Sequence, residues 1–144
     1  MADWKAELSG ILERRARASR AAQESAQFEK FLKSVVSPAF NDLAAELRKH
    51  GRSVTIREAP VSMVISVRSA EMEEISFRVL RRSVPDAVIA YAEVRIRKGQ
   101  RLVSTEANIR EGIVPLDETT SEDVINSFLR HYAMVLDSEQ TPQQ

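Results

Sequence analysis

The chain of 144 residues contains no cysteine and has few of the other residues that mark a catalytic or metal site. Without cysteine the protein forms no disulfide, and it has neither a thiolate nucleophile nor a thiolate metal ligand. The four glycines are isolated, so they form neither a phosphate-binding loop nor a dinucleotide-binding fingerprint. The two histidines, His50 and His131, lie far apart and have no second ligand at a metal-binding spacing. We therefore expect a protein without catalytic activity that binds no metal or cofactor.

Long hydrophobic runs are also absent. The longest, Ala87–Ala92, has six residues, whereas a membrane-spanning helix needs roughly 20. The N-terminal segment carries Asp3, Lys5 and Glu7 instead of a basic region followed by an apolar run, which is unlike a secretory signal. These features predict a soluble cytoplasmic protein that has no membrane partner.

Charge is balanced, with 21 basic and 21 acidic residues, so the net charge indicates no partner. Its distribution is uneven, because residues 1–110 hold 20 basic and 14 acidic side chains, whereas residues 111–144 hold one and seven. Opposite net charges attract, so we expect the C-terminal segment to dock against the rest of the chain. Arginine accounts for 16 of the 21 basic residues, which suits both anion contacts and surface ion pairs.

A continuous apolar stripe between Phe28 and Gly51 is the strongest structural signal. Its members recur at steps of three and four residues, as on one face of a helix: Phe28, Phe31, Leu32, Val35, Val36, Ala39, Phe40, Leu43 and Leu47. Pro38 either kinks this helix or begins a new one that Ser37 caps. Because the stripe passes Pro38 without a change of phase, we predict one long helix, kinked near Ser34, that Gly51 stops.

Residues 3–27 are also predicted to be helical, but their stripe is too weak to pack on a core. Four large side chains form one apolar patch, which is a candidate interaction surface: Trp4, Leu8, Ile11 and Leu12. Arginines then alternate with alanines over residues 14–22, and both residue types favour helix. Two interpretations compete for this segment. It is either an extension of the main helix that packs on another subunit or frays, or a basic arm that contacts nucleic acid or an acidic partner.

After Gly51 the apolar period changes from three and a half residues to two, which is typical of strands. Five segments show this alternation, at residues 53–58, 61–68, 75–79, 88–97 and 103–109. The connections between them are short and polar, and they include the acidic cluster Glu71, Glu73 and Glu74, which we expect in a solvated turn. Because parallel strands need a crossover of about a dozen residues, short connections predict antiparallel neighbours.

The last apolar stripe predicts a C-terminal helix, with one apolar face formed by Val124, Ile125, Phe128, Leu129, Tyr132, Val135 and Leu136. Thr119 and Glu122 have the spacing of a capping box at its start. Residues 138–144 are polar and are expected to form a disordered tail. We therefore predict a single domain over residues 1–137, with residues 3–27 as a protruding helical extension. Its class is α+β, with two layers: a five-stranded antiparallel meander sheet, and a long kinked N-terminal helix and a C-terminal helix packed on one face.

The opposite face of this sheet is predicted to be rich in arginine. Strand alternation places on it the possible anion-binding residues Arg57, Arg68, Arg78, Tyr91, Arg95, Arg97 and Arg110, together with Glu74, Glu93 and Glu106. Such a surface could bind phosphates, and the Tyr91 ring could stack on a nucleic-acid base. Alternatively, Glu93 and Glu106 pair with arginines of adjacent strands and leave a solvated face without a ligand.

Three functions follow from these patterns. The first, which the absence of recognisable chemistry favours, is a non-catalytic protein-interaction or oligomerisation module whose partner is a second copy or another protein. The second is nucleic-acid or anion binding through the sheet arginines, with residues 14–20 as a clamp. The third is a small-ligand or enzyme cup between the helices and the sheet, with Tyr91 or His131 at its mouth.

Overall fold

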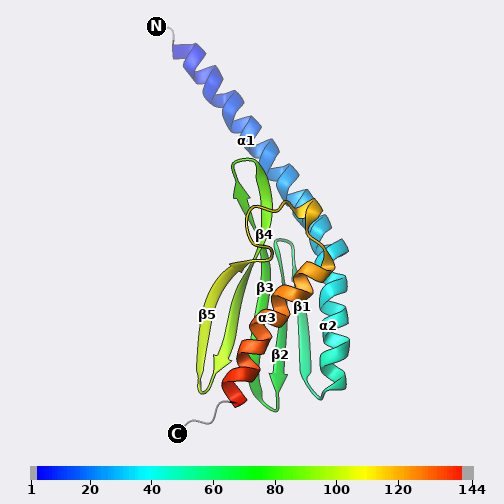
Figure 1. Ribbon diagram of the computed structural model, residues 1–144. Helices are drawn as coiled ribbons and strands as arrows, with labels where there is room; N and C mark the ends of the chain where they lie inside the picture. Colours follow the sequence, from blue (N-terminus) through cyan, green and yellow to red (C-terminus); the bar gives the residue numbers. More distant parts are fainter. Residues whose placement is uncertain (1–2, 141–144) are drawn as a thin grey trace.

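The computed structural model describes residues 3–140 and shows one long bent helix, a meander sheet and a C-terminal helix (Figure 1). The long helix comprises α1 (Asp3–Phe31), a π-helical turn, η1 (Leu32–Val36), and α2 (Ser37–Lys49). A short 3-10 turn, η2 (Leu116–Glu118), precedes the C-terminal helix α3 (Ser121–Gln140). The predicted α+β class and the order of its elements are confirmed.

The bend in the long helix coincides with the π-helical turn, which contains Ser34, the predicted position of the kink. Here the backbone N–H of Ser37 donates to the carbonyl of Leu32, five residues back, instead of four. Pro38 follows at once, in the first turn of α2, where its missing N–H costs little. The proline therefore neither breaks the helix nor begins a separate one, and the local widening absorbs its effect on the hydrogen-bond ladder.

The sheet contains β1 (Ser53–Ala59), β2 (Ser62–Ser69), β3 (Met72–Val84), β4 (Ala87–Lys98) and β5 (Arg101–Asn108). The strands lie in the order β1-β2-β3-β4-β5, and every neighbouring pair is antiparallel, as predicted. Two-residue connections join all four pairs. The longest strands are β3 and β4, and their hairpin extends past the other strands toward α1 (Figure 1).

A β-bulge interrupts the pairing of β2 with β3. Val67 lies opposite Ile75, but the next residue, Arg68, lies opposite Glu73, which leaves Glu74 as an extra residue on β3. The bulge changes the alternation, so Glu74 and Ile75 are both buried. The prediction that Glu74 lies in a solvated turn or on the outer sheet face was wrong, because strand alternation in the sequence does not reveal a bulge.

The core lies between one face of the sheet and the helices. Phe77 of β3 makes edge-to-face contacts with Phe40 of α2 and Phe128 of α3, at centroid distances of 6.2 and 5.7 Å. Helix α2 contacts β1, whereas α3 contacts β3 and β4. Strand β5 forms a free edge, and its Val103 side chain remains exposed. The helices thus cover one face of the sheet, and the second face is open to solvent.

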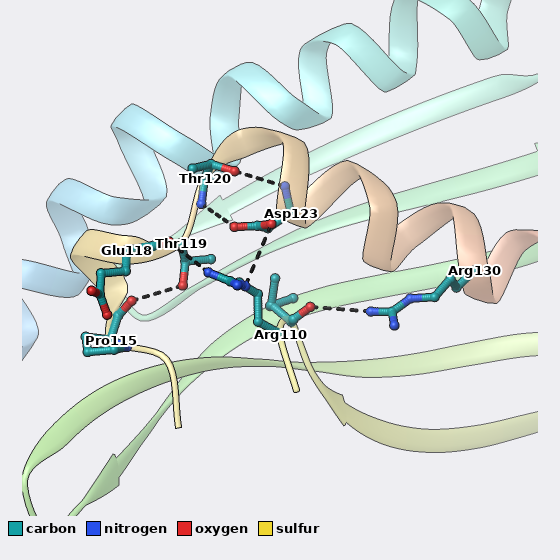
Figure 2. Close-up of polar contacts among 8 residues, drawn as sticks. Arg110, Pro115, Glu118, Thr119, Thr120, Asp123 and Arg130 are labelled. Carbon is teal, nitrogen blue, oxygen red and sulfur yellow. Dashed lines mark hydrogen bonds and ion pairs between the residues drawn. The ribbon is translucent and has the colours of Figure 1, made fainter. Parts of the chain in front are cut away.

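The start of α3 is fixed by a capping box that lies one residue later than predicted (Figure 2). The backbone N–H of Thr120 donates to the Asp123 carboxylate at 2.9 Å, and the Asp123 N–H donates to Thr120 Oγ1 at 3.2 Å. Thr119, predicted as the cap with Glu122, is buried instead, and its hydroxyl donates to the Pro115 carbonyl at 3.0 Å. Helix α3 continues to Gln140, so it includes the first part of the predicted tail, and residues 141–144 lie outside the described residues.

Candidate interaction surface

The N-terminal part of α1 projects from the body of the protein as a helical arm, which we define as residues 3–23 (Figure 1). All four residues of the apolar patch lie on this arm, and they are exposed to 61% (Trp4), 46% (Leu8), 47% (Ile11) and 56% (Leu12). The buried residues of α1 are Phe28 and Phe31, both near its C-terminal end. The structure thus presents the predicted interaction residues together on one free helical surface.

The apolar patch and the buried residues occupy different faces of α1. Successive residues of an α-helix are rotated by about 100°. From Trp4 to Phe31 the accumulated rotation leaves the two side chains about 180° apart, and from Leu8 to Phe28 it leaves them about 160° apart. The patch therefore points away from the side on which α1 joins the core. It is a separate surface and does not continue the stripe that packs on the sheet.

The arm is attached to the body at Glu24. The hydroxyl of Ser83, near the end of β3, donates to the Glu24 carboxylate at 2.6 Å. Arg81 of the same strand lies 3.8 Å from this carboxylate, and both side chains are partly buried. Phe28 then enters the core one turn later and stacks on Phe31 at 5.9 Å. These contacts hold the base of the arm against the β3–β4 hairpin and fix its direction.

The arginines of the outer sheet face contact acceptors of neighbouring strands. Arg95 donates from Nε and Nη2 to the two carboxylate oxygens of Glu73, each at 2.8 Å, and this hydrogen bonding raises the pKa of Arg95. Arg97 Nε donates to the backbone carbonyl of Glu73 at 2.8 Å. Arg78 lies 3.8 Å from the Glu93 carboxylate directly opposite it. The contact between Arg78 and Glu93 is the cross-strand pairing expected from the sequence. The prediction that Glu73 lies in a solvated turn was wrong, because β3 begins at Met72 and places Glu73 beside Arg95.

Tyr91 lies on this face with a cation above its ring. The guanidinium carbon of Arg82 is 4.2 Å from the Tyr91 ring centroid, and Arg82 also donates to the Glu106 carboxylate at 3.1 Å. The guanidinium of Arg68 donates to the backbone carbonyl of Glu71 at 2.8 Å. One face of the Tyr91 ring is therefore occupied by Arg82, and a nucleic-acid base could stack on that face only after Arg82 moves.

A shallow depression of about 400 Å³ lies on the same face and is lined by β3, β4 and β5. Its polar lining comprises Ser76, Arg78, Glu93, Arg95, Ser104, Thr105 and Glu106. Two acidic and two basic side chains thus share it, which gives it no net charge. Arg57, on the edge strand β1, is exposed and lies outside this depression. The structure brings the sheet arginines onto one face but places carboxylates between them.

Arg110 does not belong to this face. It follows the last residue of β5 and turns toward the start of α3 (Figure 2). Its guanidinium donates to the backbone carbonyl of Glu118 at 3.4 Å and lies 3.9 Å from the Asp123 carboxylate. The prediction for Arg110 was wrong because the strand ends at Asn108, two residues earlier, so strand alternation no longer applies.

Sequence reasoning missed a buried polar cluster on the other side of the sheet. Glu74 is only 1% exposed, and its Oε1 accepts from the Tyr132 hydroxyl of α3 at 2.7 Å. Arg52, between α2 and β1, donates to the same oxygen at 3.3 Å. Burial, and then the hydrogen bond with Glu74, raise the pKa of Tyr132 above its usual range, while the same carboxylate raises the pKa of Arg52. The cluster thus connects β3, α3 and the segment between α2 and β1.

The two histidines lie apart, on α3 and at the end of α2. Nδ1 of His131 is 2.8 Å from the Ser127 carbonyl in α3, and His50 lies at the end of α2. Aromatic side chains pack between the helices and the sheet, where the Phe77 ring is 6.1 Å from that of His131. His131 also lines a surface depression of about 400 Å³. Among the side chains that the structure describes in residues 3–140, no group of three or more histidine or carboxylate side chains is placed to hold a metal ion. No helix in this range is both long and apolar enough to cross a membrane.

Comparison of the chain with models of protein families, with curated proteins and with solved structures gave no match. Its function is therefore inferred from the surfaces described above.

Proposed function

We propose that the protein is a non-catalytic interaction module that associates with a second copy of itself through the arm of α1. The observation that carries this proposal is the apolar patch, in which four large side chains are exposed on a helix face turned away from the body. Transfer of such side chains from water is worth about 1.5–3 kcal/mol each when burial is complete. A protein surface that exposes apolar residues together in this way is typical of a binding site.

The construction of the arm supports the same function. In proteins, most of the stability of a helix comes from packing of its apolar face and not from the helix propensity of its residues. The α1 helix is anchored by Glu24 and Phe28 but extends about 30 Å beyond them toward Asp3. An extension of this length adds nothing to the core of its own chain. It gains its stabilisation when its apolar patch packs against a partner.

Nucleic-acid or anion binding through the sheet arginines has weaker support. Carboxylates accompany Arg78 and Arg95 in the depression, and Arg82 covers the Tyr91 ring. Binding to phosphates would require these ion pairs to open. Fluorescence anisotropy with a single-stranded oligonucleotide at low salt tests this alternative, and it would replace our proposal if the affinity were high and fell after joint substitution of Arg95 and Arg97 by glutamate.

The proposed function is tested by placing charges in the apolar patch. We expect the wild-type protein to be dimeric by light scattering after size exclusion, and the double variant Leu8→Glu, Ile11→Glu to be monomeric but still folded, with a cooperative urea transition. The matched control carries the same two new charges on exposed positions outside the patch, at Ala6 and Ala16, and should remain dimeric. A wild-type protein that stays monomeric up to high micromolar concentration would refute the proposal.

A further inference from the structure

The pattern of the arm specifies how two copies pair. Its central face carries side chains spaced alternately by four and three residues: Trp4, Leu8, Ile11 and Arg15. This is the spacing of the seam between two packed helices. All these residues are exposed, so the seam is available to a partner. Arg15 is the one charged member, and its placement constrains the partner and the orientation.

We infer that two arms pair antiparallel, with Leu8 of each copy packed against Ile11 of the other and Arg15 against Trp4. This inference rests on the proposed self-association and adds its geometry. In this register the Arg15 guanidinium lies on the Trp4 ring of the second copy, a favourable cation–π pair. In the single chain the Lys5 ammonium lies 5.7 Å from the same ring centroid, so a face of that ring is accessible to a cation.

Charge complementarity supports the antiparallel orientation. The first part of the arm is acidic, with Asp3, Glu7 and Glu13 against Lys5, whereas residues 14–20 carry four arginines. An antiparallel pair brings each acidic part beside the basic part of the second copy. Glu7 and Arg14 lie on the same flank of the seam, and the two-fold axis of an antiparallel pair brings like flanks together. With Leu8 opposite Ile11, Glu7 of one copy faces Arg14 of the other, and this contact occurs twice.

A parallel pair lacks each of these advantages. It places every residue beside its own counterpart, so Arg15 meets Arg15 in the seam, and the four arginines of residues 14–20 lie beside four more. Like charges at such positions are destabilising. Opposite flanks would then meet, which brings Glu7 toward Leu12 and Arg14 toward Ser19. Neither contact is an ion pair.

The shape of the molecule accommodates the antiparallel arrangement. The paired segment, from Trp4 to Arg15, is about 17 Å long. Glu24, where the arm meets the β3–β4 hairpin, lies about 13 Å further along the axis than Arg15. The two bodies therefore stand at opposite ends of the paired arms, and Asp3 of each copy lies opposite Ala16 of the other. The assembly closes at two copies.

The test exchanges the charges of the flanking pair in the full chain. Glu7→Arg alone and Arg14→Glu alone should each raise the dimer dissociation constant about tenfold, since each creates two like-charge contacts. The double variant Glu7→Arg, Arg14→Glu should return it to near the wild-type value, because both contacts become opposite again. Sedimentation equilibrium at low salt measures these constants. Glu13→Arg and Arg17→Glu are matched controls outside the seam and should have little effect.

The outcomes separate this inference from the proposed function. The antiparallel register would be overturned if the double variant lost at least as much dimerisation free energy as the two single variants together. The dimer of the wild-type protein would still support self-association. A second measurement uses the absence of native cysteine. Single variants Trp4→Cys and Arg15→Cys should form disulfide-linked dimers under oxidation only when mixed. Efficient linkage of either variant alone would show a parallel pair and refute the inference, whereas a monomeric wild-type protein would refute the proposed function itself.

Discussion

The buried hydrogen bond from Tyr132 to Glu74 provides a quantitative test of what holds α3 on the sheet. The Tyr132 hydroxyl donates to Glu74 Oε1 at 2.7 Å, and both residues are buried. Arg52 donates to the same oxygen at the longer distance of 3.3 Å. The substitution Tyr132→Phe removes only the hydroxyl. The ring, which is 5.5 Å from that of Phe128, keeps its packing, so no cavity larger than one oxygen forms.

The magnitude follows from the type of hydrogen bond that is lost. A hydrogen bond to a charged group contributes about 1.5–3 kcal/mol to stability, and more when its loss leaves a buried carboxylate oxygen with a weaker set of donors. Oε2 of Glu74 has no hydrogen-bond partner within the described part of the chain. Tyr132 and Arg52 both donate to Oε1, so loss of the Tyr132 hydroxyl leaves the carboxylate with the longer hydrogen bond from Arg52. We expect Tyr132→Phe to lower the free energy of unfolding by about 2 kcal/mol.

Urea unfolding at pH 7, followed by far-ultraviolet circular dichroism, measures this loss. Tyr91→Phe is the matched control, since Tyr91 lies half-buried on the outer face and is not part of the Glu74 cluster. A double-mutant cycle with Glu74→Gln isolates the coupling between the two side chains. A loss below about 0.5 kcal/mol, or equal losses for Tyr132→Phe and Tyr91→Phe, would show that the hydrogen bond from Tyr132 to Glu74 does not stabilise the fold.

The same contact predicts how stability depends on pH. Burial raises the pKa of Tyr132 in the folded state, so above pH 10, where an ordinary tyrosine ionises, the folded protein binds more protons than the unfolded chain. The stabilisation is fully present below that pH and is lost as pH rises through the folded-state pKa. Wild-type stability should therefore fall more steeply above pH 10 than that of Tyr132→Phe. Parallel curves for the two proteins would contradict this assignment.

Three smaller effects should also be measurable. Thr120→Ala removes the cap of α3 and should cost about 1 kcal/mol in urea unfolding; an unchanged midpoint would mean that Asp123 alone satisfies the helix start. Ala70 has a positive φ of 56° at the first position of the β2–β3 connection, so Ala70→Gly should stabilise the protein by about 0.5–1 kcal/mol, and destabilisation would contradict this. Glu24→Ala should speed hydrogen exchange at the tip of the β3–β4 hairpin, because Ser83 loses its partner; exchange identical to that of wild type would show that this contact does not hold the arm.

The apolar periodicity of the sequence was sufficient to predict the elements and their order. A period near three and a half residues ended at Gly51, and its φ of +80° is the left-handed conformation expected of a glycine that stops a helix. The period of two and the short connections then predicted five antiparallel strands. These features are local, since each depends on residues within a few positions of one another. The position of the helix bend before Pro38 was also predictable, but the π-helical turn that forms the bend was not.

The tertiary structure decided which side chains meet. Glu74 belongs to the interior because of a register shift against β2, and Arg110 faces α3 because β5 ends before it. Neither is encoded in alternation along a single strand. The acidic partners of the outer arginines likewise depend on the pairing of strands, as Glu73 and Arg95 are 22 residues apart in sequence. Cross-strand register is set by contacts throughout the sheet, so it is not readable from one segment.

The exposure of the apolar patch also depends partly on the sequence and partly on the tertiary structure. The sequence by itself determined that Trp4, Leu8, Ile11 and Leu12 share one face of a helix, because that follows from the rotation per residue. Only the tertiary structure decided that this face is free, since the packing of Phe28 and the hydrogen bond of Glu24 turn the other side of α1 toward the body. Helical periodicity fixes the angle between two faces, whereas contacts distant in sequence select the face that is buried.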